Sequence, residues 1–271
     1  MTKLPLEDEF TDILGKAQRG KNVSLDSLAK HCGCTVHEIR KVLSGDMNES
    51  IIRGMCELLK LNRESLMNIA KGQWHPGVDK IDGMEIFTTP FSSFTVNAFV
   101  LWNPKTLKAL IFDTGTDCSG ILEFIKTKEL DVEFICITHA HSDHIADLGK
   151  LRTAFKHADV MIGNKEVIPG AQGIEEGYTF TCGGLEVRTL LTNGHSPGGL
   201  TYVVQGLEQD VAVVRDSLFA GSMGGGRDSY DLAVKNNMEK ILQLSKDTII
   251  CPGHGPLSSV GLELAGNPFF S

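Results

Sequence analysis

The sequence contains no apolar run of 18 residues, so no segment is predicted to cross a membrane as a helix. A signal-peptide pattern is also missing, because the N-terminal stretch MTKLPLEDEF is polar and acidic. The seven cysteines are odd in number and scattered, and none belongs to a CxxC pair. This pattern favours reduced thiols over a disulfide framework. We therefore expect a cytoplasmic protein without a membrane partner.

An excess of positive charge is absent as well. The formal net charge is −8, which argues against a surface that coats nucleic acid. Residues 1–73 hold 11 Lys and Arg against 10 Asp and Glu, whereas the remaining residues hold 15 against 24. The composition thus changes near Gln73, where the turn-forming stretch QWHPGVDKIDG begins. We predict two domains, at residues 1–75 and 80–271.

The N-terminal domain has apolar residues at helical spacing. Thr35 followed by Glu38 gives a capping-box pattern before VHEIRKVLSG, and Gly45 would end that helix. Further helices are expected near residues 10–14, after a cap at Ser24 or Asp26, and at residues 51–59 and 66–70. We predict a small all-α domain.

The middle of this domain, LAKHCGCTVHEIRKVLSG, resembles the helix-turn-helix of phage-repressor domains of the Cro/C1 type. The resemblance implies a recognition helix at residues 35–43 that offers His37, Arg40 and Lys41 to DNA. A helical domain that only dimerises the protein would show the same packing pattern. The near-neutral charge favours this alternative, because DNA-binding modules usually carry a basic face. We expect a homo-oligomer and keep DNA as a further candidate partner.

One stretch concentrates residues of metal-binding type. THAHSDH, at residues 138–144, follows the apolar run EFICI, which is predicted to be a buried strand. The spacing of its three histidines and one aspartate cannot place all four side chains on one face of a helix or strand. A tight loop that divides them into two ligand sets fits better, and imidazole and carboxylate are ligands of zinc and neighbouring metals. The alternative is a surface loop that happens to be rich in histidine.

HxHxDH after a hydrophobic strand resembles the metallo-β-lactamase superfamily. The rest of that family's pattern is present in LIFDTG with Asp113, LTNGHSPGGLTY with His195, VAVVRDSLFAGS with Asp216, and IICPGHGP with His254. The resemblance covers about residues 83–271 and implies an α/β fold, an αββα sandwich with the metal site at one edge. Apolar patterns predict strands at residues 85–88, 94–102, 107–112, 133–137, 159–162, 185–191, 200–204, 211–214 and 248–251, and helices at 117–128, 145–156 and 231–244.

The resemblance also implies two divalent metal ions, expected to be zinc, with iron or manganese as alternatives. Their ligands would be His139, His141 and His195 for one ion, and Asp143, His144 and His254 for the other, with Asp216 bridging both. Two catalytic roles are expected beyond ligation. Asp143 would position the nucleophilic hydroxide or carry its proton. Asp113 would accept a hydrogen bond from a ligand imidazole and fix its tautomer, or else cap the helix that starts near Asp117.

Such a site predicts a hydrolase, because a metal-bridging hydroxide can attack a carbonyl while one metal stabilises the oxyanion. The stretches LFAGSMGGG, PGHGPLSSVGLE and NPFF resemble the short glyoxalase II-like branch, which cleaves thioesters, so we expect a small-molecule acyl substrate. The sequence departs from the family in having Arg215 where Gly usually precedes the bridging Asp. It also stops about 17 residues after His254, without the additional helical domain of full glyoxalase II.

Three further expectations concern the substrate and the domains. The loop at residues 222–230 is expected near the substrate, where Arg227 or Lys235 would meet a carboxylate or else face solvent. The alternative functions are a metal-dependent lactonase and a DNA-binding regulator with a ligand-sensing domain. Because every candidate ligand follows residue 83, we expect an enzyme without residues 1–73 to remain active.

Overall fold

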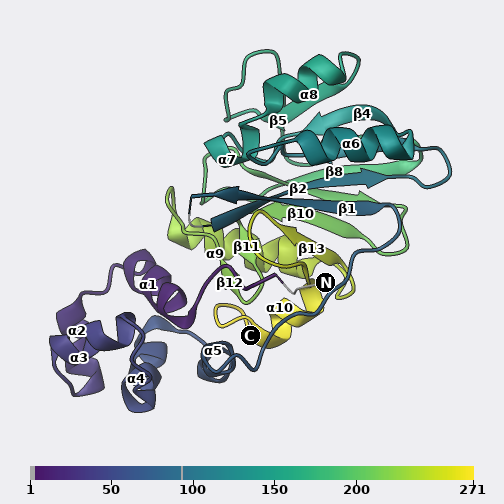
Figure 1. Cartoon of the computed structure of the whole chain (residues 1–271). Helices are drawn as coiled ribbons and strands as arrows, with labels where there is room; N and C mark the ends of the chain where they lie inside the picture. The colour runs from purple at the N-terminus through teal and green to yellow at the C-terminus, as the bar shows by residue number, and fades with distance from the viewer. Residues whose placement is uncertain (1–3, 93) are drawn as a thin grey trace.

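The computed structural model describes residues 4–92 and 94–271. Two sheets pack face to face with helices on their outer faces, and a cluster of five short helices precedes them (Figure 1). The predicted α/β sandwich with a helical N-terminal region is therefore confirmed. Among the helices of the described residues, none has both the length and the apolar character needed to span a bilayer.

The first sheet has six strands in chain order: β1 (Met84–Phe91), β2 (Phe94–Trp102), β3 (Lys108–Phe112), β4 (Asp131–Cys136), β5 (Asp159–Gly163) and β6 (Gln172–Ile174). Its first three strands are antiparallel, and β3 to β6 are parallel. The second sheet has the order β14 (Ser258–Ser259), β13 (Ile249–Pro252), β10 (Val211–Arg215), β9 (Leu200–Gln205), β8 (Leu185–Leu191) and β7 (Thr179–Cys182). In this sheet β10 and β13 are parallel, and the other pairs are antiparallel.

Alternation of side chains along the strands builds the layers. In β2, Phe99 and Leu101 belong to the core between the sheets, whereas Ala98 and Val100 pack towards the helices outside the first sheet. Those helices are α6 (Ser119–Lys128), α7 (Ser142–Ile145) and α8 (Leu148–Ala154). The second sheet is covered by α9 (Tyr230–Glu239), the 3₁₀ turn η1 (Ile241–Gln243) and α10 (Val260–Gly266). Because β2 is buried on both faces, it is a continuous apolar run in the sequence.

The helical domain has its own apolar core, in which Ile13, Ile39 and Met55 are fully buried. Its helices are α1 (Phe10–Gly20), α2 (Leu25–Cys32), α3 (Val36–Leu43), α4 (Glu49–Leu59) and α5 (Arg63–Ala70). The predicted capping box is present, because the Glu38 amide donates to Thr35 Oγ1 at 3.3 Å and the Thr35 amide donates to Glu38 Oε2 at 2.8 Å.

Several element predictions were wrong or incomplete. The helix predicted at residues 145–156 is two helices, α7 and α8, and the first begins at Ser142. The helix predicted at residues 231–244 ends at Glu239 and continues as η1. The sequence analysis missed β6, β7, β14, α10 and the hairpin of β11 (Leu218–Phe219) and β12 (Ser222–Met223). Strands of two to four residues carry too little periodicity to be recognised, and α10 has only seven residues.

Candidate metal centre

The carboxyl ends of four strands meet at one edge of the sandwich. Asp113 follows β3, and the loop with His139 follows the neighbouring parallel strand β4. In the second sheet, Asp216 follows β10 and His254 follows the parallel strand β13. His195 lies on the loop between β8 and β9. Parallel strands end at the same edge of a sheet, so this topology brings together residues that are far apart in the sequence.

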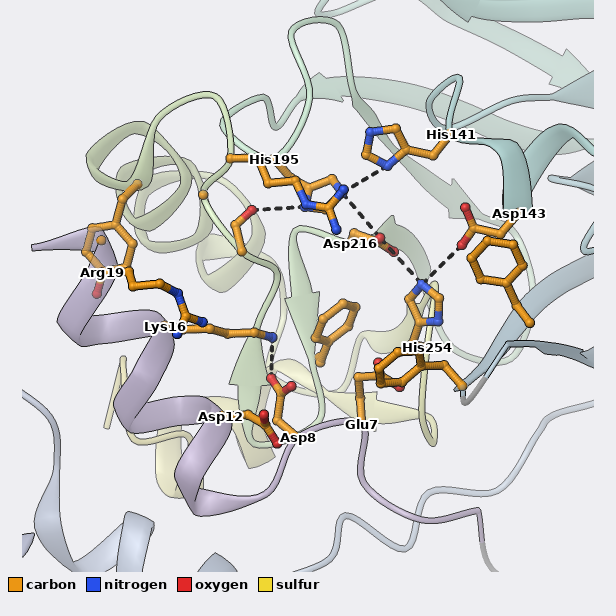
Figure 2. A pocket seen from close by; sticks show the side chains of 18 of the residues that line it. Glu7, Asp8, Asp12, Lys16, Arg19, His141, Asp143, His195, Asp216 and His254 are labelled. Atoms are coloured by element: carbon orange, nitrogen blue, oxygen red, sulfur yellow. Dashed lines mark hydrogen bonds and ion pairs between the residues drawn. The ribbon is translucent and has the colours of Figure 1, made fainter. Parts of the chain in front are cut away.

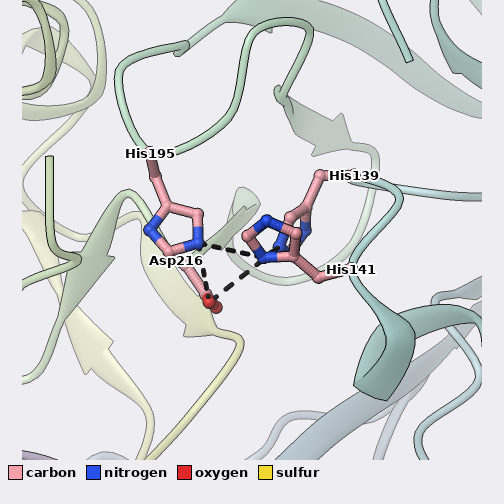
Figure 3. Close-up of side chains that lie close together, drawn as sticks. All are labelled: His139, His141, His195 and Asp216. Atoms are coloured by element: carbon pink, nitrogen blue, oxygen red, sulfur yellow. Dashed lines mark hydrogen bonds and ion pairs between the residues drawn. The ribbon is translucent and has the colours of Figure 1, made fainter. Parts of the chain in front are cut away.

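The first ligand set is His139, His141, His195 and Asp216 (Figure 3). His141 Nδ1 lies 2.9 Å from His139 Nε2 and 3.2 Å from His195 Nε2. A tetrahedral zinc ion with nitrogen ligands at about 2.0–2.1 Å would hold those nitrogens about 3.3 Å apart. The three imidazoles therefore converge as the ligands of one ion do, with Asp216 Oδ2 3.3 Å from His195 Nε2.

The second ligand set is Asp143, His144 and His254. Asp143 Oδ2 lies 3.5 Å from the Nε2 atoms of both histidines. Asp216 lies between the two sets, with Oδ1 3.5 Å from His144 Nε2 and Oδ2 3.5 Å from His254 Nε2. The structure thus brings together all seven ligand candidates of the sequence analysis, with Asp216 in the central position.

The chemistry of these atoms fits bound cations. His144 Nε2 and Asp216 Oδ1 are buried and have no hydrogen-bond partner among the described residues. Such orphaned atoms are costly unless a ligand satisfies them. Three of the candidate ligand histidines turn Nδ1 away from the site and towards an acceptor. Nδ1 of His144 lies 2.7 Å from Asp113, Nδ1 of His195 lies 3.0 Å from Gly225 O, and Nδ1 of His254 lies 2.6 Å from Thr95 O. With Nδ1 donating, each Nε2 lone pair is directed at the site.

Asp113 lies behind the ligands. Its carboxylate accepts the Thr138 amide at 2.8 Å, the Thr138 hydroxyl at 2.7 Å and His144 Nδ1. Of the two roles predicted for Asp113, the geometry fits the one that fixes a ligand imidazole, because these donors engage both carboxylate oxygens. The α6 N-cap is Cys118 instead, whose amide donates to Asp147 at 3.0 Å.

Burial and charge divide the imidazoles into two groups. Burial lowers the pKa of His139 well below its usual range, and it lowers the pKa of His195 to about 4. Burial also acts on His144 and His254, but the neighbouring carboxylates outweigh it: Asp113 and then Asp216 at His144, and Asp216 at His254. They raise the pKa of His144 to about 10 and the pKa of His254 to about 9. In turn, these imidazoles outweigh burial and hold the pKa of the Asp216 carboxyl well below its usual range.

Five of the candidate ligands, His141, Asp143, His195, Asp216 and His254, line a pocket of about 730 Å³ (Figure 2). Phe91 and Phe94, both exposed, come from the hairpin of β1 and β2. Arg227 lines the pocket as predicted, whereas Lys235 does not line it and pairs with Glu239 at 3.9 Å. Another part of the wall comes from the N-terminal region, with Glu7, Asp8, Asp12, Lys16, Arg19 and Gly20. The sequence analysis missed this wall, because its residues are indistinguishable from ordinary residues on the surface of a helix.

The sequence model of the metallo-beta-lactamase superfamily matches residues 93–254. This match covers more than half of the chain, and the chain belongs to the metallo-β-lactamase superfamily. The five N-terminal helices precede the matched region.

Individual proteins agree with this assignment. The probable metallo-hydrolase YqgX of Bacillus subtilis is 30% identical over 207 residues, which cover 67% of this chain and 95% of that protein. The hydroxyacylglutathione hydrolase GloC of Haemophilus influenzae is 25% identical over 213 residues, covering 69% of this chain and 99% of that protein. The crystal structure of the B3 metallo-β-lactamase BLEG-1 superimposes with a TM-score of 0.61 at 29% identity, covering 69% of this chain and 100% of that chain. The chain is therefore similar to metal-dependent hydrolases over most of its length.

Proposed function

We propose that the protein hydrolyses a small acyl thioester with two divalent metal ions, zinc in the first instance. The observation that carries the proposal is the position of Asp216 between two converging ligand sets. The mixed nitrogen and oxygen donors suit zinc and leave iron and manganese as alternatives. Similarity to a hydroxyacylglutathione hydrolase supports a thioester over other acyl compounds.

Bound divalent ions would supply Lewis acidity and lower the pKa of a shared water, so that a nucleophile forms near neutral pH. The chain itself supplies orientation and proton transfer. Asp143 lines the pocket beside His144 and His254, where it can take the proton of the attacking water. Asp113 holds His144 in the tautomer that keeps Nε2 directed at the site. Phe91 and Phe94 offer apolar contact to an acyl chain.

The test compares thioester and lactone hydrolysis by the wild type and by Asp216→Ala. We expect thioesters to react and the variant to lose more than about 100-fold in kcat/KM. Loss of a ligand shared by both ions should exceed the 10–100-fold effect typical of a residue behind the ligands. Asp247→Ala removes an exposed carboxylate as the matched control and should leave turnover unchanged.

Two outcomes would contradict the proposal in different ways. Near wild-type turnover by Asp216→Ala with metal still bound would show that this residue does not serve both ions. Lactone hydrolysis without thioester hydrolysis would keep the metal site but replace the substrate class.

A further inference from the structure

The helical domain is fixed to the catalytic domain by a buried polar contact. Asp8 accepts a hydrogen bond from the ammonium of Lys16 in α1 and another, at 2.5 Å, from the hydroxyl of Ser222 in β12. Lys16 also donates to the carbonyl of Met223 at 2.9 Å, and its ammonium lies 4.9 Å from the centroid of the Phe219 ring. Buried ion pairs are favourable only in a well-defined geometry. A domain on a loose tether would not provide that geometry.

Glycine residues where the two domains meet allow them to approach closely. A Cβ at Gly20, the last residue of α1, would overlap the ring of Tyr230 in α9. The indole of Trp74 lies against Gly221, where an added Cβ would be 2.7 Å from the ring, and against Gly266, where it would overlap the ring. These close contacts, together with the polar contact of Asp8, define the position of α1 at the pocket.

From this position α1 brings a cation to the metal site. Figure 2 shows Lys16 and Arg19 reaching from α1 into the pocket, opposite His141 and Asp143. Lys16 is engaged by Asp8, whereas among the described residues the Arg19 guanidinium forms no ion pair or hydrogen bond. Arg19 is exposed to the pocket and therefore available to a ligand. A guanidinium matches the paired oxygens of a carboxylate or phosphate.

We propose that Arg19 binds an oxyanion, a carboxylate or a phosphate, at the end of the substrate remote from the reacting bond. The helical domain is then a specificity element of the active site. This inference rests on the proposed hydrolase function, which places the reacting bond at the ligands on the opposite wall. Arg227 of the catalytic domain also lines the pocket, and Arg19 adds a cation to a site whose domain is acidic, because residues 74–271 hold 15 Lys and Arg against 24 Asp and Glu. The placement argues against the expectation that residues 1–73 are dispensable for catalysis.

The test uses the full-length, metal-loaded protein and three thiols whose sulfur can bind a metal ion. They carry a carboxylate, a phosphate or a neutral amide at the other end. By calorimetry, Arg19→Gln should weaken binding of at least one anionic thiol by about tenfold or more, the effect of a lost charged hydrogen bond. Binding of the neutral thiol should not change. Arg40→Gln makes the same change on an exposed residue outside the pocket and should affect none of the three.

Equal weakening of all three thiols, or no weakening of either anionic thiol, would overturn the role of Arg19. Because this readout is binding, it is independent of turnover. A protein that binds anionic thiols through Arg19 but cleaves no thioester would overturn the proposed function and keep the oxyanion site. With an active thioester, Arg19→Gln should raise KM for an anionic substrate and leave kcat nearly unchanged.

A second measurement tests the fixed domain arrangement without any metal. A protease site inserted after Asp79, which is exposed between the domains, allows the folded protein to be cut there. We expect the two fragments to elute together in gel filtration. Separation of the fragments under native conditions would show that α1 is not held at the pocket and would overturn the proposal.

Discussion

Arg215 shows how a single residue can depart from a family pattern and still serve the site. Its backbone has φ +52°, the left-handed conformation that glycine adopts most easily, which explains why glycine is usual before the bridging Asp. Its side chain is fully buried, and its guanidinium donates to Thr192 O at 2.8 Å and Ser196 Oγ at 3.1 Å. It occupies the space beside Gly199, where a Cβ would overlap the guanidinium. Arg215 thus holds the loop that carries His195.

We predict that Arg215→Met weakens metal binding by about 10–100-fold, the range typical of residues that orient a ligand. The substitution keeps much of the buried volume but removes both hydrogen bonds to the loop. Competition with a chromogenic chelator measures the affinity. Arg188→Met, on an exposed residue of β8, is the control. Unchanged affinity in Arg215→Met would show that the loop holds His195 without the guanidinium.

Glu263 is a buried acid outside the metal centre. Its carboxylate accepts hydrogen bonds from the Ser258 hydroxyl, from Asn267 Nδ2 at 2.7 Å and from the Gly221 amide at 3.0 Å. Burial nevertheless raises the pKa of Glu263 to about 7, from 4.5 for the free group. The folded protein therefore keeps this proton at pH values where the unfolded chain has lost it.

The sign of the pH effect follows from that difference. The contribution of Glu263 to the free energy of unfolding is fully present below pH 4.5, where both states are protonated, and is lost as the pH rises to about 7. The side chain of Glu263→Gln stays neutral at every pH. The free energy of unfolding of this variant, relative to that of the wild type, should therefore be higher at about pH 8 than at about pH 5. Urea unfolding at both pH values measures this change, with exposed Glu239→Gln as the control. An equal stability difference at both values would contradict it.

At the residue scale, the convergence of the seven candidate ligands could be predicted, because four of them lie within residues 139–144 and the others follow apolar strands. Asp113 could be predicted from its place after a strand. Arg19 could not, because its role depends on how α1 packs against the catalytic domain. In the sequence it is an ordinary basic residue near the end of an amphipathic helix.

Among the elements, α3 offers a surface that the catalytic site does not use. Figure 1 shows α2 and α3 at the end of the helical domain farthest from the sheets. On α3, His37, Arg40 and Lys41 are exposed, and none of them lines the pocket. The arrangement leaves this face of α3 exposed, and DNA binding by α3 stays a prediction.

We predict that Arg40→Ala combined with Lys41→Ala weakens binding of duplex DNA and leaves catalysis unchanged. Loss of two phosphate contacts should reduce the slope of log Kd against log salt by about two. Fluorescence anisotropy over a salt series measures this slope. Arg53→Ala with Lys60→Ala removes the same charge from α4 and its C-cap, where both residues are exposed. A wild type that binds no DNA at low salt would leave dimerisation as the role of α3.

Long periodic elements could be predicted and short ones could not. β2 and β8 were expected at residues 94–102 and 185–191 and lie there. The hairpin of β11 and β12 has two residues in each strand, too few for a pattern. Its Ser222 nevertheless donates a hydrogen bond to Asp8, and its Met223 carbonyl accepts one from Lys16 in α1. The helix expected from residue 145 begins at Ser142, so Asp143 and His144 lie on its first turn.

For the whole molecule, the packing of the two domains is the feature that sequence analysis could not provide. The sequence predicts an acidic sandwich and a near-neutral helical domain, but not the contacts between them. Those contacts join distant segments, such as the Asn62 amide and Pro268 O at 2.8 Å, and Ser65 Oγ and Ser271 Oγ at 2.8 Å. Each is a single polar contact, and no sequence motif marks the residues that form it. The pocket belongs to the assembled molecule, and neither domain provides all of its wall.

The metal ions are also expected to stabilise the whole molecule. Because two ligand sets flank Asp216, we predict two ions per chain by elemental analysis after purification without chelators. Removal of the ions by chelation should lower Tm, since a ligand at 100 times its Kd adds about 2.7 kcal/mol to the free energy of unfolding. Asp216→Ala should bind fewer ions and show a smaller change in Tm. One ion per chain in the wild type would contradict the two-ion site.

Proton competition gives this prediction a pH dependence. The pKa values of about 10 for His144 and about 9 for His254 mean that both imidazoles hold protons near neutral pH unless a metal ion displaces them. Metal affinity should therefore rise as the pH increases from about 7 to about 9, and the ions should be lost more readily as the pH falls. The first ligand set should depend less on pH over this range, because the pKa of His195 is about 4. Chelator titrations at several pH values should resolve one ion whose affinity depends strongly on pH and one whose affinity depends weakly on it. Identical pH dependence of both affinities would contradict the assignment of His144 and His254 to a separate ligand set.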